Sequence, residues 1–194
     1  MWAIQQQLMS YSTPAGGVTY ATRNPSDKSA NITLSWGNLI ATNGTAAWSS
    51  VRSTIWVSSG KRYLEYTIGT GSDWFVGIGN SSAALDTNYI GYDNNSWSYY
   101  YGDGRKYHTS NAVYGNSYTT WNVIGVALDM DGGTVTMYKN NVSQWTMYSS
   151  ITGTIYAMVS EYKWSWFNTV VTANFWATAQ TYSPPSGYNA GLYT

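Results

Sequence analysis

The chain has 194 residues, of which 43% are hydrophobic and only 9% charged, and nine basic and nine acidic side chains give a net charge of zero. This balance excludes the basic stripe that a nucleic-acid surface needs, and with it a polybasic membrane tether. The absence of cysteine excludes disulfides, thiolate catalysis and zinc–thiolate sites.

Helical periodicity is confined to the start of the chain, where residues 2–9 form the best helix candidate. Residues 1–28 are weakly patterned and are expected to form an N-terminal arm or docking segment, with the domain proper over residues 29–194. Residues 1–7 lack the regions of a signal peptide. No stretch approaches the ~20 apolar residues of a membrane-spanning helix.

From residue 32 onward, short alternating runs broken by Gly, Asn, Asp and Ser predict antiparallel strands. The predicted strands cover residues 32–34, 38–41, 51–57, 63–68, 74–78, 123–128, 134–139, 155–161 and 170–175. Residues 63–68 alternate cleanly, and residues 74–78 are apolar on both faces, as a central strand is. Asp131-Gly132-Gly133 supplies the positive φ angles of a tight hairpin turn. Turn signals recur every 8–12 residues or so, which favours a β-sandwich.

Several blocks, in order over residues 27–190, resemble the SPRY domain, in particular its variants in bacteriophage and other microbial proteins. The most specific is NVIGVALDMDGGTVTMYKN, residues 122–140, which is similar to a hairpin of that family nearly end to end. The other blocks are residues 58–68, 74–79, 90–99 and 184–188. The resemblance implies an all-β, antiparallel two-sheet sandwich of concanavalin-like jelly-roll architecture. It also implies a recognition module without catalytic residues, which binds peptides or other partners through variable loops.

Tryptophan departs from this resemblance at Trp36, Trp145 and Trp176, where the family usually has a small or polar residue. The chain holds 11 Trp and 19 Tyr against 3 Phe, and indole and phenol rings join an apolar face to a polar group. We therefore expect a large aromatic contact face. The alternative for any single ring is that it points inward and belongs to the core.

Catalytic and metal-binding candidates are few. The only histidine, His108, lies in a polar stretch, and no Gly-x-Ser-x-Gly elbow accompanies it. Two carboxylate pairs, Asp129 with Asp131 and Asp93 with Asp103, have the residue types that glycoside hydrolysis uses, but the first pair flanks a turn. The 129–133 segment lacks the further acidic ligands of a calcium loop. We expect no catalytic residue, no metal and no cofactor, and a hydrogen-bonded structural role for Glu65.

The remaining signal is a pair of aromatic loops, residues 94–107 and 164–167. They combine rings with small polar residues and occasional cations, which is the composition of antibody binding loops. The predicted ligand-binding residues are Trp97, Tyr99, Tyr100, Tyr101, Arg105, Tyr107, Trp145, Trp164 and Trp166.

The favoured function is a non-catalytic, virion-associated recognition module, for example in a phage tail fibre, baseplate or capsid fibre. It would bind a host surface glycan or protein, with no nucleic acid and no membrane insertion. One alternative is a structural decoration protein whose exposed tryptophans form homo-oligomer interfaces, with residues 1–28 as an anchor. A second alternative is a glycan-cleaving enzyme.

Overall fold

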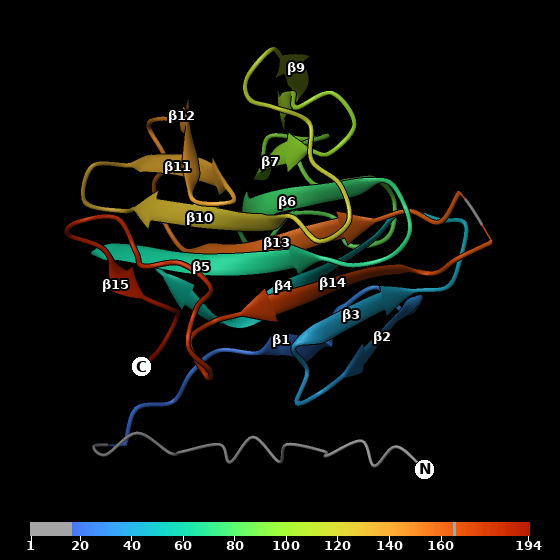
Figure 1. Ribbon diagram of the computed structural model, residues 1–194, viewed down its shortest axis with the longest axis horizontal. Coiled ribbons are helices and arrows are strands. Elements are labelled where there is room, and N and C mark those ends of the chain that lie inside the picture. The colour runs from blue at the N-terminus through green and yellow to red at the C-terminus, as the bar shows by residue number, and fades with distance from the viewer. Residues whose placement is uncertain (1–16, 165) are drawn as a thin grey trace, which may run out of the picture.

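The computed structural model describes residues 17–164 and 166–194, which form two β-sheets packed face to face (Figure 1). The seven-stranded sheet has the order β1 (Arg23–Lys28), β4 (Ser49–Val57), β13 (Ile155–Glu161), β6 (Trp74–Gly79), β7 (Ser96–Tyr100), β8 (Lys106–His108) and β9 (Ser110–Ala112). The eight-stranded sheet has the order β12 (Val142–Tyr148), β11 (Thr134–Lys139), β10 (Val123–Asp129), β5 (Lys61–Ile68), β14 (Thr169–Asn174), β3 (Ile40–Asn43) and β2 (Ile32–Ser35), and β15 (Asn189–Ala190) pairs with β5. The predicted all-β sandwich is confirmed.

The alternation of β5 shows why the two sheets pack. Leu64, Tyr66 and Ile68 point into the space between the sheets, where they join the main hydrophobic core. The opposite face of β5 is covered as well: Tyr63 and Glu65 are buried there. Period-2 alternation therefore predicted the inner face correctly.

β10 and β11 form the predicted hairpin, and their register runs from Ile124 opposite Lys139 to Asp129 opposite Thr134. Gly133 in its turn has a φ of 62°, which a side chain would disfavour. The inner face of the hairpin is apolar and lies in the main core.

A second hydrophobic cluster lies on the outer face of the seven-stranded sheet. Its buried members are Phe75, Ala83, Ile90 and Met158. Ala83 and Ile90 come from the long connection between β6 and β7, which folds back over the sheet. This connection places aromatic side chains outside the sandwich.

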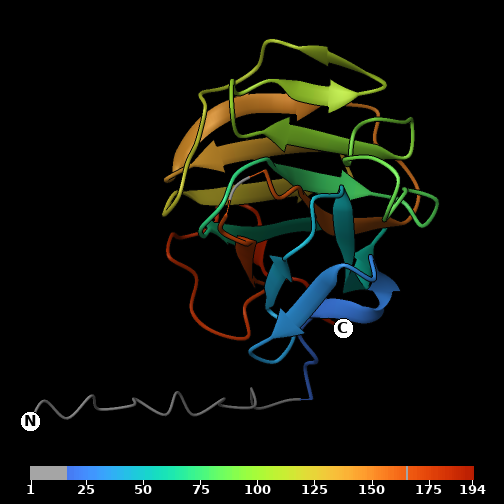
Figure 2. The ribbon, with the colours of Figure 1, turned by 90° about the vertical axis from the view of Figure 1, so that its right-hand side faces the viewer.

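The expected domain boundary near residue 28 lies within the sandwich. β1 pairs with β4, and Arg23 in it is buried. Thr19 and Thr194 exchange two backbone hydrogen bonds of 3.1 Å, so the first described residues and the C-terminus lie together, at the bottom of Figure 2. The expected helix over residues 2–9 and most of the expected arm lie outside the described residues.

Within residues 17–164 and 166–194, no helix has the length and hydropathy that crossing a membrane requires.

Candidate partner-binding surface

Aromatic rings gather around Phe75, which points outward from the seven-stranded sheet at its centre. Tyr89 stacks on Phe75 with ring centroids 4.4 Å apart and planes 9° from parallel. Trp48, Tyr100 and Tyr107 surround the same ring at centroid distances of 5.4, 4.5 and 5.1 Å. Phe75 is itself buried, so it forms the base of the cluster.

Ring contacts continue from this base to the solvent. Trp48 contacts Tyr89 at 5.2 Å and Tyr162 at 5.0 Å, and Tyr162 in turn contacts Trp164 at 4.8 Å. Tyr92 packs edge-on against Tyr89 at 5.7 Å. Tyr92 is exposed, and Trp164 is 70% exposed. We call these rings the outer aromatic cluster: Trp48, Phe75, Tyr89, Tyr92, Tyr100, Tyr107, Tyr162 and Trp164.

Hydrogen bonds hold the segment that carries Tyr89 and Tyr92 against the sheet. The Ile90 amide donates to the Ser160 hydroxyl (2.8 Å), and the Gly91 amide donates to the Ser96 hydroxyl (2.7 Å). The Ser98 hydroxyl donates to the Ile90 carbonyl oxygen (2.6 Å). All three bonds are buried, which makes this loop part of a rigid surface.

The tyrosine side chains of the outer aromatic cluster are uncharged. The Tyr100 hydroxyl donates to Asp73 Oδ1 at 2.9 Å. Burial raises the pKa of Tyr100, and it also raises the pKa values of Tyr89 and Tyr107. Burial likewise raises the pKa of the Asp73 carboxyl, against the hydrogen bond from Tyr100. The phenols therefore stay protonated at physiological pH, and they can donate and accept hydrogen bonds.

Five predicted site residues lie at this surface or directly beside it. Tyr100, Tyr107 and Trp164 belong to the outer aromatic cluster, and Trp166 on the Trp164 loop is 97% exposed. Arg105, in the turn between β7 and β8, pairs with Asp103 at 3.0 Å, next to Tyr107.

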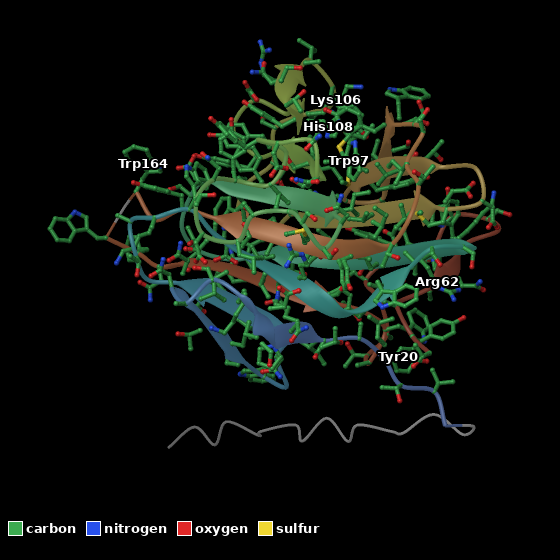
Figure 3. The ribbon with its side chains drawn as sticks, turned by 180° about the vertical axis from the view of Figure 1, so that it is seen from behind. Tyr20, Arg62, Trp97, Lys106, His108 and Trp164 are labelled. Atoms are coloured by element: carbon green, nitrogen blue, oxygen red, sulfur yellow. The ribbon has the colours of Figure 1, made fainter. Side chains whose placement is uncertain are left out.

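Three predicted residues face the interior of the sandwich, which corrects the expectation for them. Tyr99 is fully buried, and Tyr101 packs edge-on against Trp74 at 5.1 Å. Trp97 is half-buried and stacks on His108, with centroids 4.7 Å apart and planes at 15° (Figure 3). Consecutive strand residues point to opposite faces, so β7 divides the predicted patch between the two sides of its sheet.

Trp145 lies apart from the other predicted residues. It belongs to β12, at the edge of the eight-stranded sheet. Figure 1 shows β12 far from the loop between β13 and β14, which carries Trp164 and Trp166. The expected exposure of Trp145, Trp164 and Trp166 is confirmed, but they do not form one site.

Sequence reasoning missed five members of the cluster: Trp48, Phe75, Tyr89, Tyr92 and Tyr162. Tyr89 and Tyr92 lie in Asn88-Tyr89-Ile90-Gly91-Tyr92-Asp93, whose composition matches that of the two predicted aromatic loops. That composition was the available signal. Trp48 and Tyr162 sit singly at strand ends, and only the pairing of β4 with β13 brings them together.

Two of the carboxylates considered for catalysis, Asp129 and Asp131, stabilise turns. Asp129 pairs with Lys61 (Oδ2 to Nζ, 2.8 Å) and accepts a hydrogen bond from the Gly132 amide at 2.8 Å. Asp131 accepts a hydrogen bond from the Gly60 amide at 2.7 Å. These contacts join the β10–β11 turn to the β4–β5 turn.

The other candidate polar residues are also bonded locally. Asp93 accepts a hydrogen bond from the Asn95 amide (2.9 Å), and His108 Nδ1 lies 2.9 Å from the Ser96 carbonyl oxygen. No group of three or more His, Asp or Glu side chains in the described part of the chain could hold a metal ion.

The structural role expected for Glu65 is confirmed. Its carboxylate accepts hydrogen bonds from the backbone amides of Thr181 (2.7 Å) and Tyr182 (2.9 Å). Glu65 therefore fastens the C-terminal segment to the outer face of β5.

Comparison with known proteins identifies a family to which the chain is similar. A family model described as the SPRY domain matches residues 61–175. Ran-binding protein 9 of Xenopus laevis and of Homo sapiens are each 32% identical over 149 residues, which cover 70% of this chain and 27% and 20% of theirs. The chain thus spans between a fifth and just over a quarter of the length of these relatives.

Two solved structures share the fold. The SPRY domain of human HERC1 has a TM-score of 0.69 at 20% identity, covering 78% of this chain and 96% of that one. Stonustoxin has a TM-score of 0.66 at 20% identity, covering 80% of this chain and 27% of its own.

Proposed function

The chain belongs to the SPRY domain family, and on that premise we propose that it is a non-catalytic module that binds a protein partner through the outer aromatic cluster. SPRY domains are protein-interaction modules. The observation that carries the proposal is the continuous path of ring contacts from buried Phe75 to exposed Trp164. Such a path gives an exposed indole a rigid, preorganised base, and rigid aromatic anchors dominate protein interfaces.

The chemistry of the surface favours an uncharged stretch of polypeptide. Protonated phenols at Tyr89, Tyr100 and Tyr107 offer hydrogen bonds to backbone amides, and the rings offer apolar area. The two relatives described above are named Ran-binding proteins, which supports a protein as the class of partner.

Replacement of Trp164 by alanine is expected to weaken partner binding by about 30-fold or more, the usual effect of removing an aromatic hot spot. The fold is expected to survive, because Trp164 is 70% exposed. The measurement begins with 12-residue peptides selected on the wild-type protein from a displayed random library. Their dissociation constants are then compared for wild type and variant by calorimetry.

Trp36→Ala is the matched control, since Trp36 is 74% exposed and lies in the turn between β2 and β3 of the other sheet. It should bind the selected peptides as the wild type does. Equal affinity of wild type and Trp164→Ala for every selected peptide would contradict the proposal, as would a library that yields no binder.

Location in a virus particle is a separate proposal. The low charge and the hydroxyl-rich composition support it, although the relatives named above are vertebrate proteins. If this proposal is right, an antibody against this chain should label purified virus particles.

The decoration-protein alternative draws support from the exposure of Trp36 and Trp121, and sedimentation of a clean monomer at high concentration would contradict it. Glycan cleavage is not favoured, because Asp129 and Asp131 are engaged in turns.

A further inference from the structure

The edge strand β12 contains a β-bulge at Trp145. Its pairing with β11 shifts register between Ser143 and Thr146, so that Gln144 and Trp145 together oppose Met137. Bulges bend a strand and redirect side chains, and they often lie beside functional sites. Here the redirected side chain is an indole.

Trp145 adopts a backbone conformation that suits glycine far better than tryptophan. Its φ is 68°, in the left-handed region where a Cβ is sterically costly. The side chain contributes little to the core in return, since it is 79% exposed. The stability of the fold therefore does not account for an indole at this position.

Tyr114 fixes the bulge. Its hydroxyl accepts a hydrogen bond from the Met137 amide (3.1 Å) and donates one to the Trp145 carbonyl oxygen (2.6 Å). Backbone groups that the bulge leaves without strand partners are therefore satisfied by a side chain. Strand addition by another chain at this point is disfavoured, because these groups are already bonded.

Beside Trp145 lies an open depression of about 350 Å³. Its lining contains no charged side chain and consists of Tyr114, Gly115, Asn116, Val142, Ser143, Gln144 and Trp145. Two hydrogen bonds hold the Gln144 side chain in the lining of the depression. Its Oε1 accepts one from the Asn116 backbone amide (2.8 Å), and its Nε2 donates one to the Val142 carbonyl oxygen (2.9 Å).

Two polar groups of the depression are available to a ligand. Among the described residues, Asn116 and Trp145 make their hydrogen bonds through backbone atoms. The Asn116 carboxamide can therefore donate and accept, and the Trp145 indole N–H can donate.

We propose that this depression is a saccharide-binding site, in which the face of Trp145 stacks against a neutral sugar ring and Asn116 hydrogen-bonds its hydroxyl groups. A pyranose presents an apolar C–H face and a rim of hydroxyls, which match an indole beside a carboxamide. The volume lies at the lower end of small-ligand sites. The uncharged lining offers no counter-charge to an ionic ligand. The site lies on a different sheet from the outer aromatic cluster and does not depend on the protein-binding proposal.

The test observes the Trp145 indole N–H directly. The ¹⁵N-labelled chain is titrated with neutral hexasaccharides of glucose, mannose and N-acetylglucosamine, and the Trp145 cross-peak is identified by its loss in Trp145→Gly. At least one hexasaccharide is expected to shift this cross-peak saturably while the Trp36 cross-peak stays in place.

Trp145→Gly separates binding from folding. Glycine suits a φ of 68°, so the variant should melt no lower than wild type, whereas its affinity for the hexasaccharide should fall at least about 10-fold. Trp36→Gly is the matched control: Trp36 also has a positive φ (53°) and is 74% exposed, at the opposite edge of the same sheet. It should bind as wild type does.

Three outcomes would overturn the proposal. The first is that no hexasaccharide moves the Trp145 cross-peak at 20 mM. The second is that all exposed indoles shift alike, which indicates non-specific stacking. The third is unchanged affinity in Trp145→Gly. If a displayed peptide shifts the Trp145 cross-peak saturably and no saccharide does, the depression binds a polypeptide instead of a saccharide.

Discussion

Raising the pH from about 5 to about 8 is expected to lower the free energy of unfolding by several kcal/mol, because β13 ends in a buried carboxyl group. Glu161 is fully buried, and neither of its carboxyl oxygens has a hydrogen-bond partner among the described residues. Burial raises the pKa of Glu161 from 4.5 to about 8, against the opposing effect of the Arg23 charge.

The surroundings of Glu161 explain why Arg23 does not neutralise it. The Arg23 guanidinium donates to the carbonyl oxygens of Leu39 (3.1 Å) and Val171 (3.0 Å), and it lies 5.4 Å from the centre of the Tyr66 ring. Burial lowers the pKa of Arg23 and raises that of Tyr66. The positive charge is thus bound to carbonyls and a ring rather than to the carboxylate.

Other polar neighbours of Glu161 are neutral. Asn43 Nδ2 donates to the Glu161 backbone carbonyl oxygen (2.9 Å), and the Thr169 hydroxyl donates to the Asn43 carbonyl oxygen (3.3 Å). Arg23 on β1 is therefore the charged group that acts on this carboxyl group.

The sign of the effect follows from proton binding. Between pH 4.5 and about 8 the folded chain keeps the Glu161 proton while the unfolded chain has lost it, so stability falls as the pH rises. The contribution is complete below pH 4.5 and lost above about 8. At about 1.4 kcal/mol per pKa unit, the total is on the order of 4–5 kcal/mol.

Glu161→Gln keeps the shape of the side chain and removes its titration. Urea unfolding at pH 5, 7 and 9 should show a steep loss of stability for wild type and a nearly flat profile for the variant. A slope in Glu161→Gln equal to that of wild type would contradict the prediction.

Gly91→Ala is expected to destabilise the fold by at least about 3 kcal/mol and to weaken binding of the selected peptides. A Cβ at Gly91 would lie 2.5 Å from the Tyr107 carbonyl oxygen and 2.6 Å from the Ser98 hydroxyl, and the backbone φ there is 89°. Relief of this overlap must lift the segment that carries Tyr89 and Tyr92. The outer aromatic cluster would then lose its order.

Gly60→Ala separates steric overlap from backbone strain. Gly60 has a similar φ of 76°, but nothing lies within 4 Å of a Cβ built on it. Its substitution should cost only about 1–2 kcal/mol, the penalty of the left-handed conformation itself, and should leave peptide binding unchanged. Similar unfolding free energies for the two variants, measured in urea, would show that the 89–92 segment can move freely.

Local sequence patterns determined the central strands of this protein. The alternation in β5, the apolar run of β6 and the Asp131–Gly133 turn can be read from neighbouring residues, because strand faces and tight turns depend on spacings of two to four residues. The resemblance to the SPRY family extended the prediction from single strands to the whole sandwich, because the blocks that resemble the family appear in order along the chain.

The edge strands β1 and β12 were missed because their sequences do not alternate. β1 contains Pro25 and few apolar residues, and it becomes a strand because β4 presents an open edge and Arg23 finds buried carbonyl oxygens. β12 is interrupted by the bulge at Trp145. Proline and bulges are compatible with an edge strand, where one side needs no partner.

Composition by itself favoured aromatic rings at the surface, since the chain holds 11 Trp and 19 Tyr against 3 Phe, and indole and phenol rings join an apolar face to a polar group. Only the tertiary structure decided which rings lie there. Tyr99 and Tyr100 are neighbours in sequence, yet one lies in the core and the other in the outer aromatic cluster. Trp48, Tyr89 and Tyr162 meet because non-local strand pairing and the long connection after β6 bring them together, and no pattern within one segment contains that information.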